Sequence, residues 1–171
     1  MSYFNQFGTI VYDPAGDGSA KLCTDIMSRV RVRANMKKEI IMLDPYNVKE
    51  NETPEIVADK HHGSPYYHWV VMLLNDISDV NHDWVKSTRQ MQKYLFSKYT
   101  QTQLTETHHY EISQTSGDST ITIEVENSTY PSATTVTNYE YEVAVNESKR
   151  EIDLLQNEFL TFFVDEFQNS I

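Results

Sequence analysis

The spacing of apolar and polar residues changes along this chain, and each change predicts a different element. The clearest pattern lies between residues 46 and 75. Residues 46–48 (Tyr-Asn-Val) have the composition of a short strand, and a polar turn follows at residues 50–52. Thr53 can then cap a helix whose first residue is Pro54, where the missing N–H costs nothing. The pattern predicts a strand that leads through a turn into a helix.

A second helix is expected directly after the first. Gly63 can adopt the left-handed conformation that ends helices, and Ser64-Pro65 repeats the signal for a helix start. The apolar residues that follow have helical spacing; they are Tyr66, Trp69, Val70, Leu73 and Leu74. This spacing predicts that Tyr66 and Trp69 fill the core while Tyr67 faces outward.

The first 43 residues read as an arm followed by a helix. Residues 8–12 predict an extended segment, and a turn-rich loop through Pro14, Gly16 and Gly18 comes next. Residues 23–43 fit both a strand and a helix, and we favour the helix. Cys23, the only cysteine, is interpreted as a small buried apolar residue.

The second half of the chain predicts a mixture of elements. Ser87 can cap a helix that runs toward Tyr99, and the alternation at 109–113 and 120–125 predicts a β-hairpin around Ser116-Gly117-Asp118. Residues 127–137, rich in Ser and Thr, are interpreted as a linker. Thr137 and Glu140 form a capping-box pattern at the start of another helix.

The last 22 residues allow two interpretations. They could continue the preceding helix, or residues 150–155 could form a strand and residues 157–170 a last amphipathic helix. We favour the second. The phenylalanines of that helix, Phe159, Phe162, Phe163 and Phe167, are interpreted as core or partner-facing residues and not as a cofactor site.

Composition points to protein partners. The net charge of -11 and the pI near 4.9 argue against nucleic acid, because phosphate binding needs a basic surface. The charge is uneven, since residues 29–38 are basic whereas residues 139–171 carry eight acidic residues against Lys149 and Arg150. Eleven Tyr and seven Phe are many for a monomer of 171 residues and indicate interfaces.

Residue usage also predicts where the protein resides. One cysteine excludes an intrachain disulfide. The N-terminus shows no signal-peptide pattern, and the longest apolar run, Trp69–Leu74, is too short to cross a bilayer. A soluble protein made in the cytoplasm is expected.

Candidate chemistry is weak throughout. The histidine pairs at 61–62 and 108–109 lack a further ligand at metal-binding spacing, and the second pair should face opposite sides of a strand. Residues 16–19 lack the lysine of a P-loop, and no nucleophile motif surrounds Cys23. We therefore expect no enzyme activity, no catalytic residue, no cofactor and no metal.

Two segments carry a resemblance to a known family. Residues 46–58 (Tyr-Asn-Val-Lys-Glu-Asn-Glu-Thr-Pro-Glu-Ile-Val-Ala) resemble the opening of a LysM module. Residues 63–75, with Trp84 and the helix at 87–99, resemble the gene 53 family of baseplate wedge proteins of contractile-tailed phages. Weaker similarity at 108–111 and 146–150 extends the resemblance over about residues 22–168.

The resemblance implies a structural role in a virion. It implies an inter-wedge clamp in the tail baseplate, present in multiple copies and made in the host cytoplasm. Its partners would be other wedge subunits, neighbouring wedges and a sheath-initiator-type protein, with no nucleic acid or membrane. The core and interface candidates are Tyr46, Pro54, Tyr66, Tyr67, Trp69, Trp84, Phe159, Phe163 and Phe167.

The expected fold class is α+β, with a small LysM-like β-αα core, a β-hairpin insertion and extended N- and C-terminal segments. We expect four parts: 1–43, an arm and helix; 44–99, the LysM-like core; 100–137, the β-hairpin and linker; and 138–171, a helical interface segment with a possible second sheet strand. In a LysM module the second strand follows the second helix closely, whereas here residues 76–99 intervene.

If residues 150–155 supply that strand, the interruption argues against an intact glycan groove. The alternative function is a LysM-type module that binds peptidoglycan or chitin fragments. A metal-dependent hydrolase is a distant third.

Overall fold

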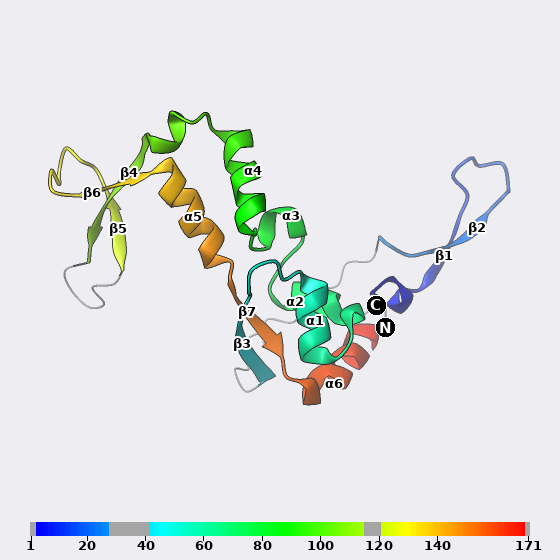
Figure 1. The fold of residues 1–171 in the computed structure, drawn as a ribbon. Helices are drawn as coiled ribbons and strands as arrows, with labels where there is room; N and C mark the ends of the chain where they lie inside the picture. The colour runs from blue at the N-terminus through cyan, green and yellow to red at the C-terminus, as the bar shows by residue number, and fades with distance from the viewer. Residues whose placement is uncertain (1–2, 28–41, 115–120, 170–171) are drawn as a thin grey trace. The chain divides into compact units, whose positions relative to one another are not determined.

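The computed structural model describes residues 3–27, 42–114 and 121–169 (Figure 1). The chain divides into two compact units. Unit 1 comprises the residues up to Trp84 together with those from Glu151 onward, and unit 2 comprises Val85–Arg150. Unit 2 is therefore an insertion in the sequence of unit 1. The described residues contain both helices and strands, which confirms the expected α+β class.

Unit 1 is built around a strand–helix–helix–strand arrangement. Its described elements are η1 (Tyr3–Gln6), β1 (Thr9–Tyr12), β2 (Lys21–Thr24), β3 (Leu43–Asn47), α1 (Pro54–His62), η4 (Pro65–Tyr67), α2 (His68–Leu74), α3 (Val80–Asp83), β7 (Glu151–Leu155) and α6 (Asn157–Asn169). Strands β3 and β7 pair antiparallel, with Tyr46 opposite Ile152 (Figure 1). The strand predicted at 150–155 thus exists, and it completes a sheet with the strand predicted at 46–48.

The predicted start and end signals place α1 correctly. Thr53 is extended at the N-cap, Pro54 occupies the first turn, and Gly63 ends the helix with φ 71°. The Thr53 side chain makes no capping hydrogen bond to the helix backbone. Ser64 accepts from the Tyr66 N–H and begins the next helical segment. The prediction of two helices separated by a tight turn is confirmed.

The core of unit 1 forms between α2, β7 and α6. The indole of Trp69 is 4% exposed and its ring centroid lies 4.6 Å from that of Phe167. Other buried members of this cluster are Phe7, Val70, Leu74, Leu155, Phe163 and Val164. Burying side chains of this size is worth roughly 1.5–3 kcal/mol each. The last 19 residues of the described chain are thus part of a folded core.

Unit 2 combines two helices with a three-stranded sheet. Its described elements are α4 (Thr88–Lys98), η5 (Gln103–Thr105), β4 (Thr107–Ser113), β5 (Thr122–Val125), β6 (Thr134–Thr137) and α5 (Asn138–Ser148). The strand order is β5-β4-β6. Ser87 with Gln90 and Thr137 with Glu140 form complete capping boxes at the starts of α4 and α5. Both predicted helix starts are confirmed.

Three sequence interpretations need correction. The supposed linker at 127–137 ends in strand β6, which pairs with β4, so its Thr-rich end belongs to the sheet. Cys23 is exposed and lies in β2, paired with Ile10 of β1, so it is not a buried residue. The helix favoured for 23–43 is wrong at both ends, where β2 and β3 lie; residues 28–41 lie outside the described residues.

Candidate interaction surfaces

The candidate residues fall into two groups in unit 1. Tyr67, Trp69, Phe159, Phe163 and Phe167 gather in the aromatic core between α2 and α6. Tyr46, Pro54 and Trp84 lie elsewhere in the same unit, near the turn that precedes α1. The sequence therefore identified residues that support the fold more often than residues that are available to a partner.

The exposure of Tyr66 and Tyr67 is the opposite of what the sequence predicted. Tyr66 is 62% exposed, whereas Tyr67 is partly buried and packs against the core cluster. The cause is the local geometry, because residues 65–67 form a 3-10 helix. A 3-10 helix advances about 120° per residue, so an α-helical stripe drawn through Tyr66 misplaces it. Tyr66 is the tyrosine of this pair that a partner can reach.

The turn before α1 is organised by the buried carboxylate of Glu52. Its Oε2 accepts from the Tyr46 hydroxyl at 2.9 Å and from the Lys49 backbone N–H at 2.8 Å, and Lys60 donates to Oε1 at 2.6 Å. The Trp84 indole donates to the Glu52 carbonyl at 2.8 Å. Burial raises the pKa of Glu52, but the hydrogen bonds from Lys60, the Lys49 N–H and Tyr46, together with the Lys60 charge, hold the pKa below its ordinary value. The carboxylate is therefore a structural anion.

Unit 2 contains a similar buried carboxylate, Glu142 of α5. It is 5% exposed and accepts hydrogen bonds from Lys98 and from the Tyr99 hydroxyl, the latter at 2.9 Å. Burial raises the pKa of Glu142, but these donors hold it below its ordinary value, and the Glu142 carboxylate in turn raises the pKa of Lys98. The ion pair ties the end of α4 to α5, so it too serves the fold.

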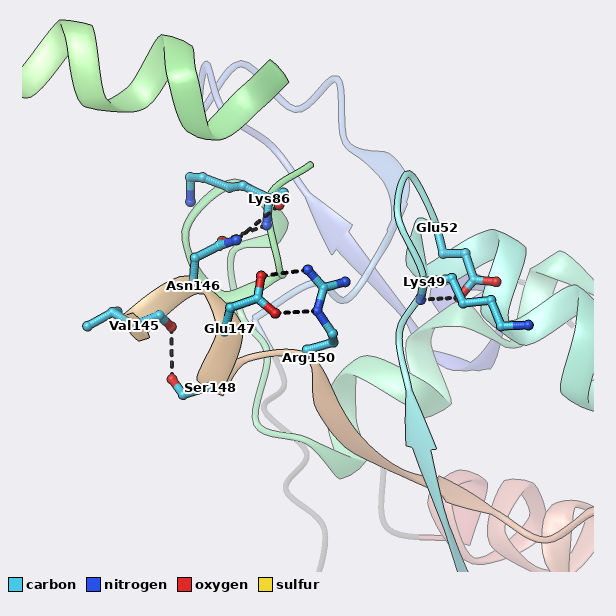
Figure 2. A network of polar contacts seen from close by, with 8 residues as sticks. All are labelled: Lys49, Glu52, Lys86, Val145, Asn146, Glu147, Ser148 and Arg150. Atoms are coloured by element: carbon cyan, nitrogen blue, oxygen red, sulfur yellow. Dashed lines mark hydrogen bonds and ion pairs between the residues drawn. The ribbon is translucent and has the colours of Figure 1, made fainter. Parts of the chain in front are cut away.

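Further polar contacts close the C-terminal end of α5 (Figure 2). Asn146 exchanges two hydrogen bonds with the backbone of Lys86, and Arg150 makes a bidentate ion pair with Glu147 at 2.7 Å for each bond. Figure 2 also shows the Lys49 N–H that donates to Glu52. Sequence reasoning missed the contact between Asn146 and Lys86, because partners 60 residues apart leave no local pattern.

Some of the exposed surfaces of unit 1 carry apolar residues. The β1–β2 hairpin has all eight paired residues exposed, with Val11 72% and Leu22 71% exposed at opposite positions of one pair. An isolated two-stranded hairpin is only marginally stable in water. A hollow of about 500 Å³ in unit 1 is lined by Tyr3, Phe4, His68, Trp69, Met72 and Leu73, among others. Such features suit contacts with other proteins.

The histidines do not form a metal centre in the described part of the chain. A β-bulge in β4 brings His108 and His109 together, with their Nδ1 atoms 2.8 Å apart, so the expectation that they face opposite sides is wrong. His109 Nε2 also lies 2.8 Å from Glu111. No group of three or more potential ligands is present among the described residues. No described helix has the length and apolar character needed to cross a bilayer.

These features define a protein whose buried polar groups serve its fold and whose exposed apolar residues are available to partners. Exposed apolar residues of this kind are typical of a protein that binds other proteins. The family model described as base plate wedge protein 53 matches residues 22–132, which is more than half of the chain. The chain therefore belongs to the base plate wedge protein 53 family of phages. A comparison with curated proteins found no match.

Proposed function

We propose that this protein clamps adjacent wedges of a contractile-tail baseplate together during assembly. The single observation that carries the proposal is the family match over residues 22–132, because a base plate wedge component acts through contacts with other baseplate subunits. The partners would be wedge scaffold subunits, neighbouring wedges and a sheath-initiator-type protein. The role requires no catalysis, and neither buried carboxylate is free to act on a substrate.

The arrangement of the chain supports this role. A clamp must hold at least two partners, and this chain has two compact units, each with its own exposed apolar residues. In unit 1 these include Val11, Leu22 and Tyr66, and in unit 2 they include Phe96 and Tyr130. We also propose that β3, α1, α2 and β7 form a LysM-like unit that serves protein contacts, with unit 2 inserted before its last strand.

The β1–β2 hairpin provides the sharpest test of the clamp. Val11→Ser combined with Leu22→Ser removes an exposed apolar pair without touching the core, so the purified variant should melt like the parent chain. Phage carrying the double variant should accumulate separate wedges that do not close into a baseplate, as seen by sedimentation and electron microscopy. The matched control is Thr9→Ser with Thr24→Ser. These two residues pair with each other on the same face of the hairpin as Val11 and Leu22, and they stay polar, so the control should assemble normally. Normal infectious baseplates in the Val11/Leu22 variant would contradict this use of the hairpin.

A further inference from the structure

Helix α4 in unit 2 presents a basic and aromatic face. Arg89, Gln92, Lys93, Phe96 and Ser97 line a shallow hollow of about 570 Å³. Their spacing of three, four, seven and eight residues places them on one side of the helix. Phe96 is the aromatic residue of this face, and its side chain is 66% exposed. An exposed aromatic ring on the same face as an arginine is a feature of protein interfaces.

The charge of this segment is opposite to that of the whole chain. Residues 85–105 contain four basic residues and no acidic residue, whereas the chain carries a net charge of -11. Two of these basic residues interact within unit 2: Lys98 forms an ion pair with Glu142, and the Lys86 ammonium lies over the ring of Tyr94. Arg89 and Lys93 make no ion pair with any described residue. They are available to an acidic partner.

Helix α6 in unit 1 presents a face of the opposite sign. Glu158, Thr161, Phe162 and Asp165 are all exposed, at a spacing of three, four and seven residues. Phe162 is 58% exposed, while its neighbours Phe163 and Phe167 point into the core. Neither Glu158 nor Asp165 makes an ion pair within the described residues. This face is acidic and aromatic where the α4 face is basic and aromatic.

We propose that the α4 face of one copy of this chain binds the α6 face of a second copy. Arg89 and Lys93 would meet Glu158 and Asp165, and Phe96 would pack beside Phe162, which removes both exposed rings from water. Each copy offers one face of each kind, so every copy can take part in this contact through its α4 face, its α6 face or both.

The expected contact is weak in isolation. Faces on helices of 11 and 13 residues are smaller than the roughly 800 Å² per partner of a standard stable interface. The charged groups are exposed, and their attraction is screened as the Debye length falls from about 10 Å at 0.1 M salt to about 3 Å at 1 M. Copies held close together by other subunits would gain from the effective concentration. The proposal does not depend on the clamp role, because it concerns the purified chain alone.

The test is analytical ultracentrifugation of the full chain and of charge-reversed variants. Measurements should extend to about 1 mM protein, where even a contact with a millimolar Kd is detectably populated. Association should appear at low salt and weaken at high salt. It should be lost in Arg89→Glu/Lys93→Glu and in Glu158→Lys/Asp165→Lys. The variant that combines all four changes restores the net charge of -11 and should associate again.

Matched controls separate a specific contact from a change in net charge. Lys21→Glu/Lys49→Glu alters the net charge as the α4 variant does, and Asp59→Lys/Glu124→Lys alters it as the α6 variant does; all four of these residues are exposed. Both controls should associate like the parent chain, and circular dichroism should show every variant folded. A chain that stays monomeric at all concentrations, association that survives either reversal, or a four-fold variant that fails to associate would each overturn the proposal. A monomeric chain would assign these faces to other subunits.

Discussion

The side-chain amide of Asn146 makes two reciprocal hydrogen bonds with the backbone of Lys86: Nδ2 donates to the carbonyl at 3.0 Å, and Oδ1 accepts from the N–H at 2.8 Å (Figure 2). The side chain of Asn75 makes the same pair of bonds with the backbone of Asp153: its Nδ2 donates to the carbonyl at 2.8 Å, and its Oδ1 accepts from the N–H at 2.9 Å. In both cases the side-chain amide offers one donor and one acceptor to the backbone of a single residue, as the backbone of a paired strand would. Each unit thus has an asparagine whose reciprocal pair of hydrogen bonds joins segments that are distant in sequence.

Replacing Asn146 with Ala should destabilise unit 2. The residue is 7% exposed, and its loss removes the partners of the Lys86 N–H and carbonyl. Leaving buried polar groups unpaired costs about 1–3 kcal/mol. Urea denaturation followed by circular dichroism would measure the change in the free energy of unfolding. The control Asn169→Ala, at an exposed helix end, should change it by no more than about 0.5 kcal/mol; equal effects would show that the amide clamp does not contribute.

Trp69→Ala should prevent unit 1 from folding. The indole contacts Phe163 and Phe167 in the core, and replacing a buried Trp with Ala costs about 3–5 kcal/mol. That loss approaches the total stability of a small domain. Thermal melting of the variant should show no cooperative transition for this unit. Tyr66→Ala, three residues earlier and 62% exposed, should melt like the parent chain.

The stability of unit 2 should fall in acid through Glu142. Its pKa in the folded state lies below 4.5, so the ionised form stabilises the fold above that pH, and the contribution is lost as the pH falls below 4.5 through the folded pKa. Glu142→Gln should therefore destabilise the protein at pH 7 and make little difference in strong acid. Unfolding free energies across this pH range would measure the effect. A constant difference between Glu142→Gln and the parent chain at every pH would contradict it, and the exposed Glu151→Gln serves as control.

Truncation after Arg150 should unfold unit 1 and leave unit 2 folded. It removes β7, the only described partner of β3, and takes Leu155, Phe163 and Phe167 out of the core. Truncation after Asn138 should also remove α5 and so disrupt both units. Circular dichroism and limited proteolysis would compare the two truncated chains. If the chain cut after Asn138 kept a cooperative fold, the C-terminal residues would act mainly as an interface, as their sequence first indicated.

Binding to cell-wall glycans should be absent. Sugar recognition by stacking needs exposed aromatic rings; Trp69 and Tyr67 are engaged in the core, which leaves Tyr66 as the single ring of this cluster that could stack on a sugar. Pull-down on peptidoglycan and chitin should be negative for the parent chain. Saturable binding that disappears in Tyr66→Ala, but not in the α4 variant Phe96→Ala, would support the glycan-binding alternative.

Elements with strong local signals were predictable from the sequence. The starts of α1, α4 and α5 carry capping residues and a proline or a capping box, and these act through neighbours within three residues. The strand at β7 and the helix at α6 followed from a change of period between them. The family resemblance rested on the same well-marked segments, and the match to residues 22–132 confirmed it.

Apart from the reversal of Tyr66 and Tyr67, which has a local cause, the errors discussed here arose where the structure depends on distant partners. Strand β6 is polar and Thr-rich, so it reads as a linker until its pairing with β4 is known. Strand β2 has no buried face, which removes the alternation by which strands are recognised. The carboxylates of Glu52 and Glu142 resemble any surface acid in the sequence, because only the fold brings Lys60 and Lys98 to them.

The pairing of β3 with β7 sets an order of events during synthesis. Residues 43–47 wait for residues 151–155, which leave the ribosome only after all of unit 2 has been made. Unit 2 is continuous in sequence and can therefore fold as soon as it emerges, whereas the earlier part of unit 1 remains incomplete until residues 151–169 have been made. Pairing β3 with β7 is slow because the two strands are far apart in sequence. If unit 2 has already folded, the flexible loop that must be closed between them is shorter. Unit 2 is thus expected to fold before unit 1, although unit 1 begins earlier in the sequence.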